Sequence, residues 1–386
     1  MADASHAADG QERERSGPGR KLRFRIGRAG ADADNGRRGG VRALEAPGAV
    51  ASTPSKRPSV NTNRSFWVAL VVGVPVSASF LWLAFRNVDA NEMWEVVTGA
   101  DRLSLLLAVA VIGFVYVLQG LRWRTLVGRP QPSRRRYAQL VVAGIACNNV
   151  LPGRVGELYR GRLIGLEAGL PSGRGFATVI LDRSFDIFAL AAFLCVSLPI
   201  VVEEAWLVPI AVGSGFLLAA IAAGLVFARR YTSRRTRNRR PRGLVRRVVR
   251  DTLEGLATPL GRRRIAGAFA LSLAAWGVWA TATVVVASSL GIDLGLRDVL
   301  FVVAVLNLGA AIPSSPGFVG TFQWLGVEAL GALDVPREEA LAFSIVMHAT
   351  WYVPTTLFGA YVLLARTDWI AFRRRSETGA VGGDHV

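Results

Sequence analysis

Six long apolar runs, each about as long as a membrane-spanning helix, constrain this chain more than any other feature. A helix of about 20 apolar residues crosses the roughly 30 Å hydrocarbon layer of a bilayer. The chain is 51% hydrophobic over 386 residues, which is more than the core of a soluble domain needs. We therefore expect an all-α polytopic membrane protein with about six spanning helices. The predicted spans are residues 66–85, 103–121, 176–200, 206–228, 265–290 and 341–365.

The residues before the first apolar run differ in kind from the rest. Residues 1–63 are rich in Gly, Arg, Ala, Asp and Ser and nearly free of aromatic side chains, so we expect a disordered tail. The first apolar run begins only at Phe66, too late for a signal peptide, and we expect it to stay as a permanent anchor. The predicted membrane domain covers residues 64–366, followed by a second tail, residues 367–386.

The distribution of arginine predicts the orientation. Loops 122–136 and 229–264 are rich in Arg, whereas loops 87–101, 201–205 and 334–339 are mainly acidic. Because short basic loops stay in the cytoplasm, this pattern predicts a multi-pass protein of the bacterial cytoplasmic (inner) membrane with both termini inside. The net charge of +18 then reflects topology and attraction to anionic membrane lipids.

The second basic loop also contains an apolar stripe, formed by Leu244, Val245, Val248, Val249, Leu253 and Leu256, opposite a row of arginines. Such a pattern suits a helix that lies on anionic lipid. No aromatic or groove-reading element accompanies the arginines, so we expect no nucleic-acid partner.

Two further apolar stretches, residues 137–166 and 301–333, are interrupted by one shared pattern. The first contains Pro152-Gly153-Arg154-Val155-Gly156 and the second Pro316-Gly317-Phe318-Val319-Gly320. In the topology above each stretch begins and ends on the same side of the membrane. Charged residues in the first stretch are too costly to face lipid, and non-helical backbone at this depth needs shielding by protein or water. We therefore predict two re-entrant helical hairpins that turn at the breaks.

The spacing of the breaks indicates an internal duplication. A shift of about 164 residues, the separation of Pro152 and Pro316, places span 103–121 on 267–285 and span 176–200 on 340–364. The first copy starts outside and the second inside, so we predict inverted-topology repeats, as in many secondary transporters. Repeat A covers residues 103–200 and repeat B residues 265–365, joined by the basic linker 229–264.

Each break is expected to start a half-helix whose positive end points toward the middle of the bilayer. We place Pro152 and Pro316 near the first helical turn, with Ser315 as a cap. Free N–H groups and the helix dipole favour an anion there, and the guanidinium of Arg154 suits phosphate. The alternative is that both breaks are only packing kinks.

Polar residues near the breaks leave further alternatives open. Asn148 and Asn149 either satisfy freed backbone groups or contact substrate, and Glu157 is spaced to pair with Arg154. Arg160 and Arg162 are interpreted as topology-setting arginines rather than head-group ligands.

A second polar group lies in span 176–200, where Asp182 and Asp186 share one helix face on either side of Arg183. These carboxylates either pair with arginines of the first hairpin or form a site for a coupling ion or proton. His348 is interpreted as a hydrogen-bonded interior histidine, with a proton relay as the alternative. The candidate substrate-binding residues are Asn148, Asn149, Pro152, Gly153, Arg154, Gly156, Glu157, Asp182, Arg183, Asp186, Ser314, Ser315, Pro316, Gly317, Gly320 and Gln323.

Three motifs in order resemble a known family. They are residues 148–157 (Asn-Asn-Val-Leu-Pro-Gly-Arg-Val-Gly-Glu), residues 182–186 and residues 312–321 (Ile-Pro-Ser-Ser-Pro-Gly-Phe-Val-Gly-Thr). This pattern resembles the flippase-like membrane region of lysylphosphatidylglycerol synthases, over roughly residues 66–366. The resemblance implies lipid translocation and leaves the lipid open. In the full synthases a soluble domain follows that transfers an aminoacyl group from tRNA to phosphatidylglycerol. Because this chain ends soon after Arg375, we expect that domain to be missing.

Enzyme functions find little support in the residues. The sequence has no glycine-rich nucleotide loop with a lysine and no group of His, Cys and carboxylates at metal-ligand spacing. We therefore expect a non-enzymatic protein without cofactor, metal site or catalytic residues, which moves a phosphate-bearing lipid across the membrane. The alternative is a membrane subunit that presents lipid to a separate aminoacyl- or glycosyltransferase.

Overall fold

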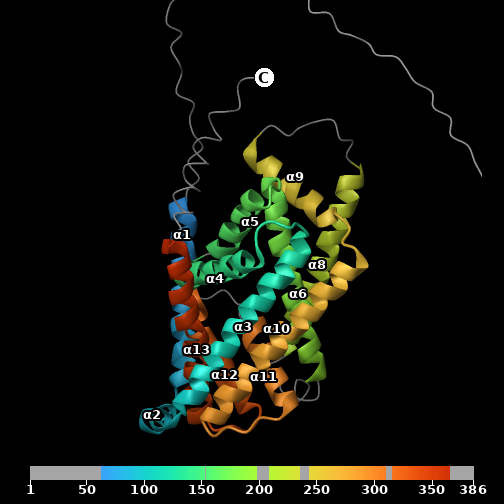
Figure 1. Cartoon of the computed structure of the whole chain (residues 1–386). Coiled ribbons are helices and arrows are strands. Elements are labelled where there is room, and N and C mark those ends of the chain that lie inside the picture. Colours follow the sequence, from blue (N-terminus) through green and yellow to red (C-terminus); the bar gives the residue numbers. More distant parts are fainter. Residues whose placement is uncertain (1–61, 153, 198–207, 235–242, 310–314, 366–386) are drawn as a thin grey trace, which may run out of the picture. The chain divides into compact units, whose positions relative to one another are not determined.

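The computed structural model describes residues 62–152, 154–197, 208–234, 243–309 and 315–365, and these residues form helices joined by loops and turns (Figure 1). The all-α prediction is confirmed for this part of the chain. The α-helices are α1 (Thr62–Phe85), α2 (Ala90–Gly99), α3 (Arg102–Val127), α4 (Arg134–Val150), α5 (Val155–Glu167), α6 (Ser172–Val196), α8 (Val208–Arg234), α9 (Leu244–Ala257), α10 (Arg262–Ser289), α11 (Leu296–Gly309), α12 (Thr321–Gly331) and α13 (Arg337–Ala365), with a 3-10 turn, η2, at Pro316–Phe318.

Among the described residues, four helices are long and apolar enough to cross a membrane. They are α3, α8 over Val212–Ser233, α10 and α13, and they match four of the six predicted spans. Predicted span 66–85 lies within α1, whose residues Gly73–Phe85 form a shorter apolar helix. Predicted span 176–200 is helical as far as Val196, and its charged residues interrupt the apolar run.

Two predicted segments need adjustment. The acidic loop 87–101 contains a helix, α2, because Asp89 caps it by accepting hydrogen bonds from the N–H groups of Asn91 and Glu92 at 2.8 and 3.2 Å. Met93 anchors this helix in a small apolar cluster. The predicted tail 1–63 lies outside the described residues except for Thr62 and Asn63, which begin α1. The tail 367–386 also lies outside them.

The predicted amphipathic helix of the basic loop is present as α9, and one side of it contacts α6. The Thr252 hydroxyl donates to the carbonyl of Gly173 in α6 at 3.0 Å, and Val248 lies against the same glycine. Leu244 and Val245 remain exposed. The backbone of Val248 and the Thr252 hydroxyl therefore contact α6, and the lipid contact of the apolar stripe stays a prediction.

Close glycine contacts hold α3, α4, α5 and α6 together. A Cβ on Gly120 of α3 would lie 2.6 Å from the backbone nitrogen of Ala138 in α4. A Cβ on Gly156 of α5 would overlap the carbonyl oxygen of Gly144 in α4, and one on Gly175 of α6 would overlap a carbonyl of α5. Small residues let helix backbones approach this closely in membrane proteins. These contacts bring the polar side chains of α3, α5 and α6 within reach of each other.

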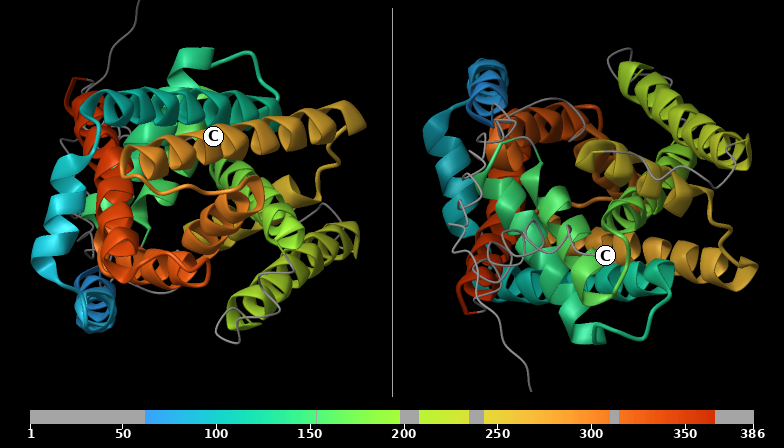
Figure 2. Two further views of the ribbon diagram at one scale, coloured as in Figure 1. Left: turned by 90° about the horizontal axis from the view of Figure 1, so that it is seen from below. Right: turned by 90° about the horizontal axis from the view of Figure 1, so that it is seen from above.

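The helices follow the same order in both predicted repeats. Helices α3, α4, α5 and α6 contain 26, 17, 13 and 25 residues, and α10, α11, α12 and α13 contain 28, 14, 11 and 29 residues. The two leading helices, α3 and α10, lie side by side (Figures 1 and 2). The inverted relation of the repeats and the re-entrant course of the shorter helices stay predictions.

Candidate functional site

The first break separates α4 from α5 at residues 151–154. Arg154 occupies the position just before α5 with φ 54° and ψ 40°, a left-handed conformation that is uncommon outside glycine. Its side chain is exposed. Pro152 was predicted near the first turn of the half-helix, but it lies before that turn, because α5 begins only at Val155. Gly153 lies outside the described residues.

Asn148 joins the end of α4 to the start of α5. Its side-chain oxygen accepts a hydrogen bond from the N–H of Gly156 at 2.7 Å, and its amide nitrogen donates to Glu157 Oε2 at 2.8 Å. Of the two interpretations of Asn148, satisfaction of a freed backbone group is therefore confirmed. Asn149 points elsewhere and donates to the hydroxyl of Thr356 in α13 at 2.8 Å. The pairing of Glu157 with Arg154 stays a prediction.

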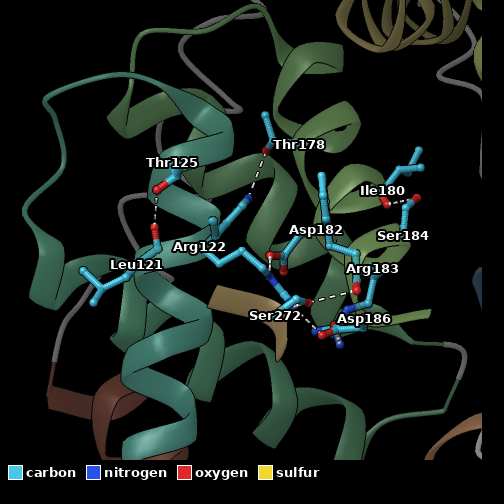
Figure 3. A network of polar contacts seen from close by, with 12 residues as sticks. Leu121, Arg122, Thr125, Thr178, Ile180, Asp182, Arg183, Ser184, Asp186 and Ser272 are labelled. Atoms are coloured by element: carbon cyan, nitrogen blue, oxygen red, sulfur yellow. Dashed lines mark hydrogen bonds and ion pairs between the residues drawn. The ribbon is translucent and has the colours of Figure 1, made fainter. Parts of the chain in front are cut away.

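Arg122 of α3 lies at the centre of a buried ion-pair network (Figure 3). Its Nε is 2.9 Å from Asp182 Oδ1, and its Nη1 is 2.5 Å from Asp186 Oδ1. Both carboxylates belong to α6, one helical turn apart. Nη1 also donates to the Ser272 hydroxyl of α10 at 2.6 Å, and that hydroxyl donates to the carbonyl of Phe185 at 2.9 Å. One arginine thus ties α3, α6 and α10 together.

Arg160 of α5 supplies the second guanidinium. Its Nη2 donates to Asp182 Oδ2 at 2.8 Å, and its guanidinium carbon lies 4.3 Å from the ring centre of Trp123. The side chain is 1% exposed, so the interpretation of Arg160 as a topology-setting arginine at the membrane surface is wrong. Gly144 of α4 leaves the room that this side chain occupies, since a Cβ there would lie 2.6 Å from Arg160 Cδ.

Arg183 completes the network at its more accessible edge. Its Nη1 is 3.2 Å from Asp186 Oδ2, and its Nε is 3.9 Å from Glu157 Oε1, with 35% of the side chain exposed. The indole nitrogen of Trp276 in α10 also donates to Asp186 at 3.0 Å. The pairing of the α6 carboxylates with an arginine of the first hairpin is confirmed by the contact of Arg160 with Asp182.

Three arginines and three carboxylates therefore neutralise one another within the helix bundle. A buried charge is tolerated only when it is paired and hydrogen-bonded, and this requirement is stricter in lipid than in water. Asp182 lies about 15 Å from the start of α6, given a rise of about 1.5 Å per residue. The network therefore lies well inside the helix bundle and next to the first break.

Sequence reasoning missed Arg122, Ser272 and Trp276. Arg122 was assigned to the basic loop 122–136, yet it is fully buried within α3. The signal that identifies it is the unpaired acidic surplus of α6, since two buried carboxylates need a cation from another helix. No comparable sequence signal marks Ser272 or Trp276, which are ordinary residues of an apolar helix.

The second break consists of η2 and the start of α12. Ser315 occupies the N-cap position of η2, as predicted, but its side chain makes no capping hydrogen bond. Its hydroxyl donates to carbonyls at 3.3 and 3.4 Å instead. The N–H of Ser315 donates to the hydroxyl of Ser77 in α1 at 2.8 Å. Pro316 does begin η2, as predicted, whereas α12 begins only at Thr321. Ser314 lies outside the described residues.

The second break lies against the last turn of α4, immediately before the first break, and this is where the two breaks meet. A Cβ on Gly317 of η2 would lie 3.2 Å from the carbonyl oxygen of Asn149, the last residue but one of α4. The Tyr352 hydroxyl of α13 donates to that same carbonyl at 3.2 Å. The candidate residues therefore form two adjoining groups. One is the first break with the ion-pair network, and the other is the second break with Gly317, Gly320 and Gln323.

Comparison with known families fits this architecture. A family model described as the lysylphosphatidylglycerol synthase TM region matches residues 66–359. The chain belongs to this family. It is accordingly a multi-pass membrane protein, and the resemblance noted from the three motifs is confirmed.

Two proteins similar to this chain carry different names. Glycosyltransferase AglD of Haloferax volcanii is 27% identical over 342 aligned residues, which cover 77% of this chain and 54% of that protein. A UPF0104 membrane protein of Methanothermobacter thermautotrophicus is 27% identical over 125 residues, which cover 31% of this chain and 36% of that protein. The chain spans about half the length of the first relative and about a third of the second.

Proposed function

We propose that this chain moves a phosphate-bearing lipid, of the phospholipid, aminoacyl-phospholipid or polyprenyl-phosphate type, across the membrane. The observation that carries this proposal is the contact between the two helix breaks at Asn149 and Gly317. Many transporters form a substrate site within the bilayer from discontinuous helices whose broken ends meet.

The chemistry at the first break favours an anionic head group. Arg154 stands exposed at the N-terminal end of α5, where the helix dipole adds positive potential. Arg183, partly exposed, lies on the neighbouring helix beside Glu157. Guanidinium groups bind phosphate through two parallel hydrogen bonds, so the pair offers a phosphate site at the edge of an otherwise neutralised network.

The order of helices supports alternating access to this site. Each predicted repeat contributes a long helix, a broken pair and a second long helix, and the breaks contact one another where the repeats meet. Rocking of two such inverted repeats would expose a central site to one side of the membrane and then to the other. We infer that Arg122 and Arg160 hold α3, α5 and α6 as one unit during this motion.

An alternative function is presentation of a lipid to a separate transferase. The specific observation in its favour is that one relative is named a glycosyltransferase and extends well beyond the matched region. In this second function the membrane region would bind the lipid at the same breaks without moving it between leaflets.

Lipid scrambling in proteoliposomes tests the proposal. Head-group-labelled phospholipid is quenched by dithionite only in the outer leaflet, so movement appears as additional quenching. We expect movement by the wild type, loss in Arg154→Ala and no change in the matched control Arg129→Ala, another exposed arginine. Absence of movement with every anionic lipid and polyprenyl phosphate tried, in correctly folded wild type, would overturn transport. Binding of the same lipid by that protein would then support presentation.

A further inference from the structure

His348 of α13 is buried against the second break and hydrogen-bonded on both ring nitrogens. Its Nδ1 lies 2.8 Å from Gln323 Nε2, and its Nε2 lies 2.9 Å from the carbonyl oxygen of Gly317. The ring is 5% exposed and is packed by Phe322, at 4.8 Å between ring centres, and by Trp351, at 5.1 Å. Every polar atom of the imidazole therefore faces the broken segment.

The backbone determines which nitrogen of His348 carries the proton. The N–H of Gly320 can only donate, so the atom of Gln323 at 2.7 Å from it must be the carbonyl oxygen, Oε1. The amide nitrogen of Gln323 therefore faces His348, and Nδ1 must accept from it. Because the Gly317 carbonyl can only accept, Nε2 must carry a hydrogen. The arrangement accommodates the neutral ring protonated on Nε2 and no other form.

A second proton on the ring would break this arrangement. Protonated Nδ1 would place two donors 2.8 Å apart, facing one another. Gln323 cannot rotate its amide to present oxygen to His348 without losing the N–H of Gly320. That glycine precedes α12 with φ 86°, and Gly317 has φ 72°, so both residues are in left-handed backbone conformations that glycine adopts readily.

The other titratable groups around His348 do not offer an alternative proton site. Tyr352 packs edge-on to the ring at 5.3 Å and donates to α4. On the neighbouring helices, Tyr116 of α3 is bonded to Thr355, two turns along α13. Glu328 of α12 is 3.8 Å from Arg337, at the start of α13 and about three turns before His348. Within the described part of the chain, the ring thus meets aromatic and amide groups rather than charges.

We propose that His348 is a proton-binding site that controls the second break. The neutral ring holds Gly317 and, through Gln323, Gly320. The protonated ring still donates from Nε2 to Gly317 but loses the Nδ1 contact with Gln323, which releases Gly320 and lets the segment between η2 and α12 change conformation. This control concerns the break itself and holds whether or not the chain moves lipid. If it does, protons regulate access to the site from the second repeat.

The protonation state can be observed directly, because the chain has three histidines and His6 and His385 are remote in sequence. Replacing both of these by glutamine leaves His348 as the sole source of signal in protein labelled with ¹⁵N-histidine. We expect solid-state NMR in liposomes at neutral pH to show one protonated nitrogen, Nε2, and one unprotonated nitrogen, Nδ1. Acidification should convert Nδ1 to the protonated form. A ring protonated on Nδ1 at neutral pH would overturn the inference.

The conformational consequence is measured by cysteine labelling at the two breaks. In a background without Cys147 and Cys195, Val319→Cys reports on the second break and Leu151→Cys is the matched control at the first, since these side chains are 42% and 39% exposed. Taking the ratio of their labelling rates cancels the effect of pH on thiol reactivity. We expect acidification to raise the ratio about tenfold, which corresponds to losing about 1.4 kcal/mol, the scale of one hydrogen bond.

Variants separate this proton site from a structural role. In His348→Gln the ratio should no longer depend on pH, and in Gln323→Leu it should be high at every pH. An unchanged wild-type ratio across the pH range in which NMR shows Nδ1 becoming protonated would overturn the proposal. So would an equal response to pH in His348→Gln.

Discussion

Replacing Asp182 by asparagine should destabilise this protein more than any other conservative change in the ion-pair network. Asp182 uses both carboxylate oxygens, Oδ1 toward Arg122 at 2.9 Å and Oδ2 toward Arg160 at 2.8 Å, and is 1% exposed. An asparagine offers one oxygen and turns an N–H₂ group toward the other guanidinium. After the change, Arg122 still pairs with Asp186. Among the described residues, the contact that remains for Arg160 is the ring of Trp123.

The expected cost follows from this loss of compensation. Leaving one member of a buried ion pair without its partner costs about 3–5 kcal/mol. The contact with Trp123 is present before and after the change, so it does not reduce the difference. We therefore expect Asp182→Asn to lower the stability by about 3–5 kcal/mol. Adding Arg160→Gln should restore part of it, because the uncompensated charge is then gone.

Thermal unfolding in nanodiscs measures the effect, reported as the rate of irreversible unfolding if refolding fails. Glu254→Gln is the matched control, because its pair with Arg250, at 3.4 Å, is partly exposed to solvent and should contribute no more than about 1 kcal/mol. Two results would refute the reasoning. One is a stability of Asp182→Asn within about 0.5 kcal/mol of wild type, the range of ordinary surface changes. The other is a double variant whose loss equals the sum of both single losses.

Two further predictions concern backbone packing and pH. Gly156→Ala should prevent stable packing of α4 on α5, because the new Cβ would overlap the Gly144 carbonyl oxygen, whereas Gly113→Ala, with open space around it, should be tolerated; yield and thermal stability distinguish the two. Hydrogen bonds from the Ser104 hydroxyl and N–H lower the pKa of Asp101 at the start of α3. Its contribution to stability is therefore present at neutral pH and lost as the pH falls through that lowered pKa, so the stability difference between wild type and Asp101→Ala should shrink in acid.

The structure also explains which site predictions failed. Arg122 and Arg160 were assigned to the membrane surface because arginine in membrane proteins usually sets topology. Their burial depends on which helices pack against α6. A single sequence does not specify those helix contacts. The predicted position of Pro152 was wrong for a local reason. Arg154 adopts a left-handed conformation and occupies the position just before α5. Two interpretations of Asn148 were open, and the structure confirms the bond to a freed backbone N–H, which joins residues close together in the chain.

The sequence by itself determined the all-helical class, four of the long apolar helices, the positions of both breaks and the family, because these depend on runs of neighbouring residues and on local motifs. Only the tertiary structure decided that Asp182 and Asp186 share Arg122, that the two breaks meet at Asn149, and that Gln323 fixes the tautomer of His348. These contacts join residues far apart in the chain. Their geometry follows from glycine-mediated helix packing, which no single segment specifies.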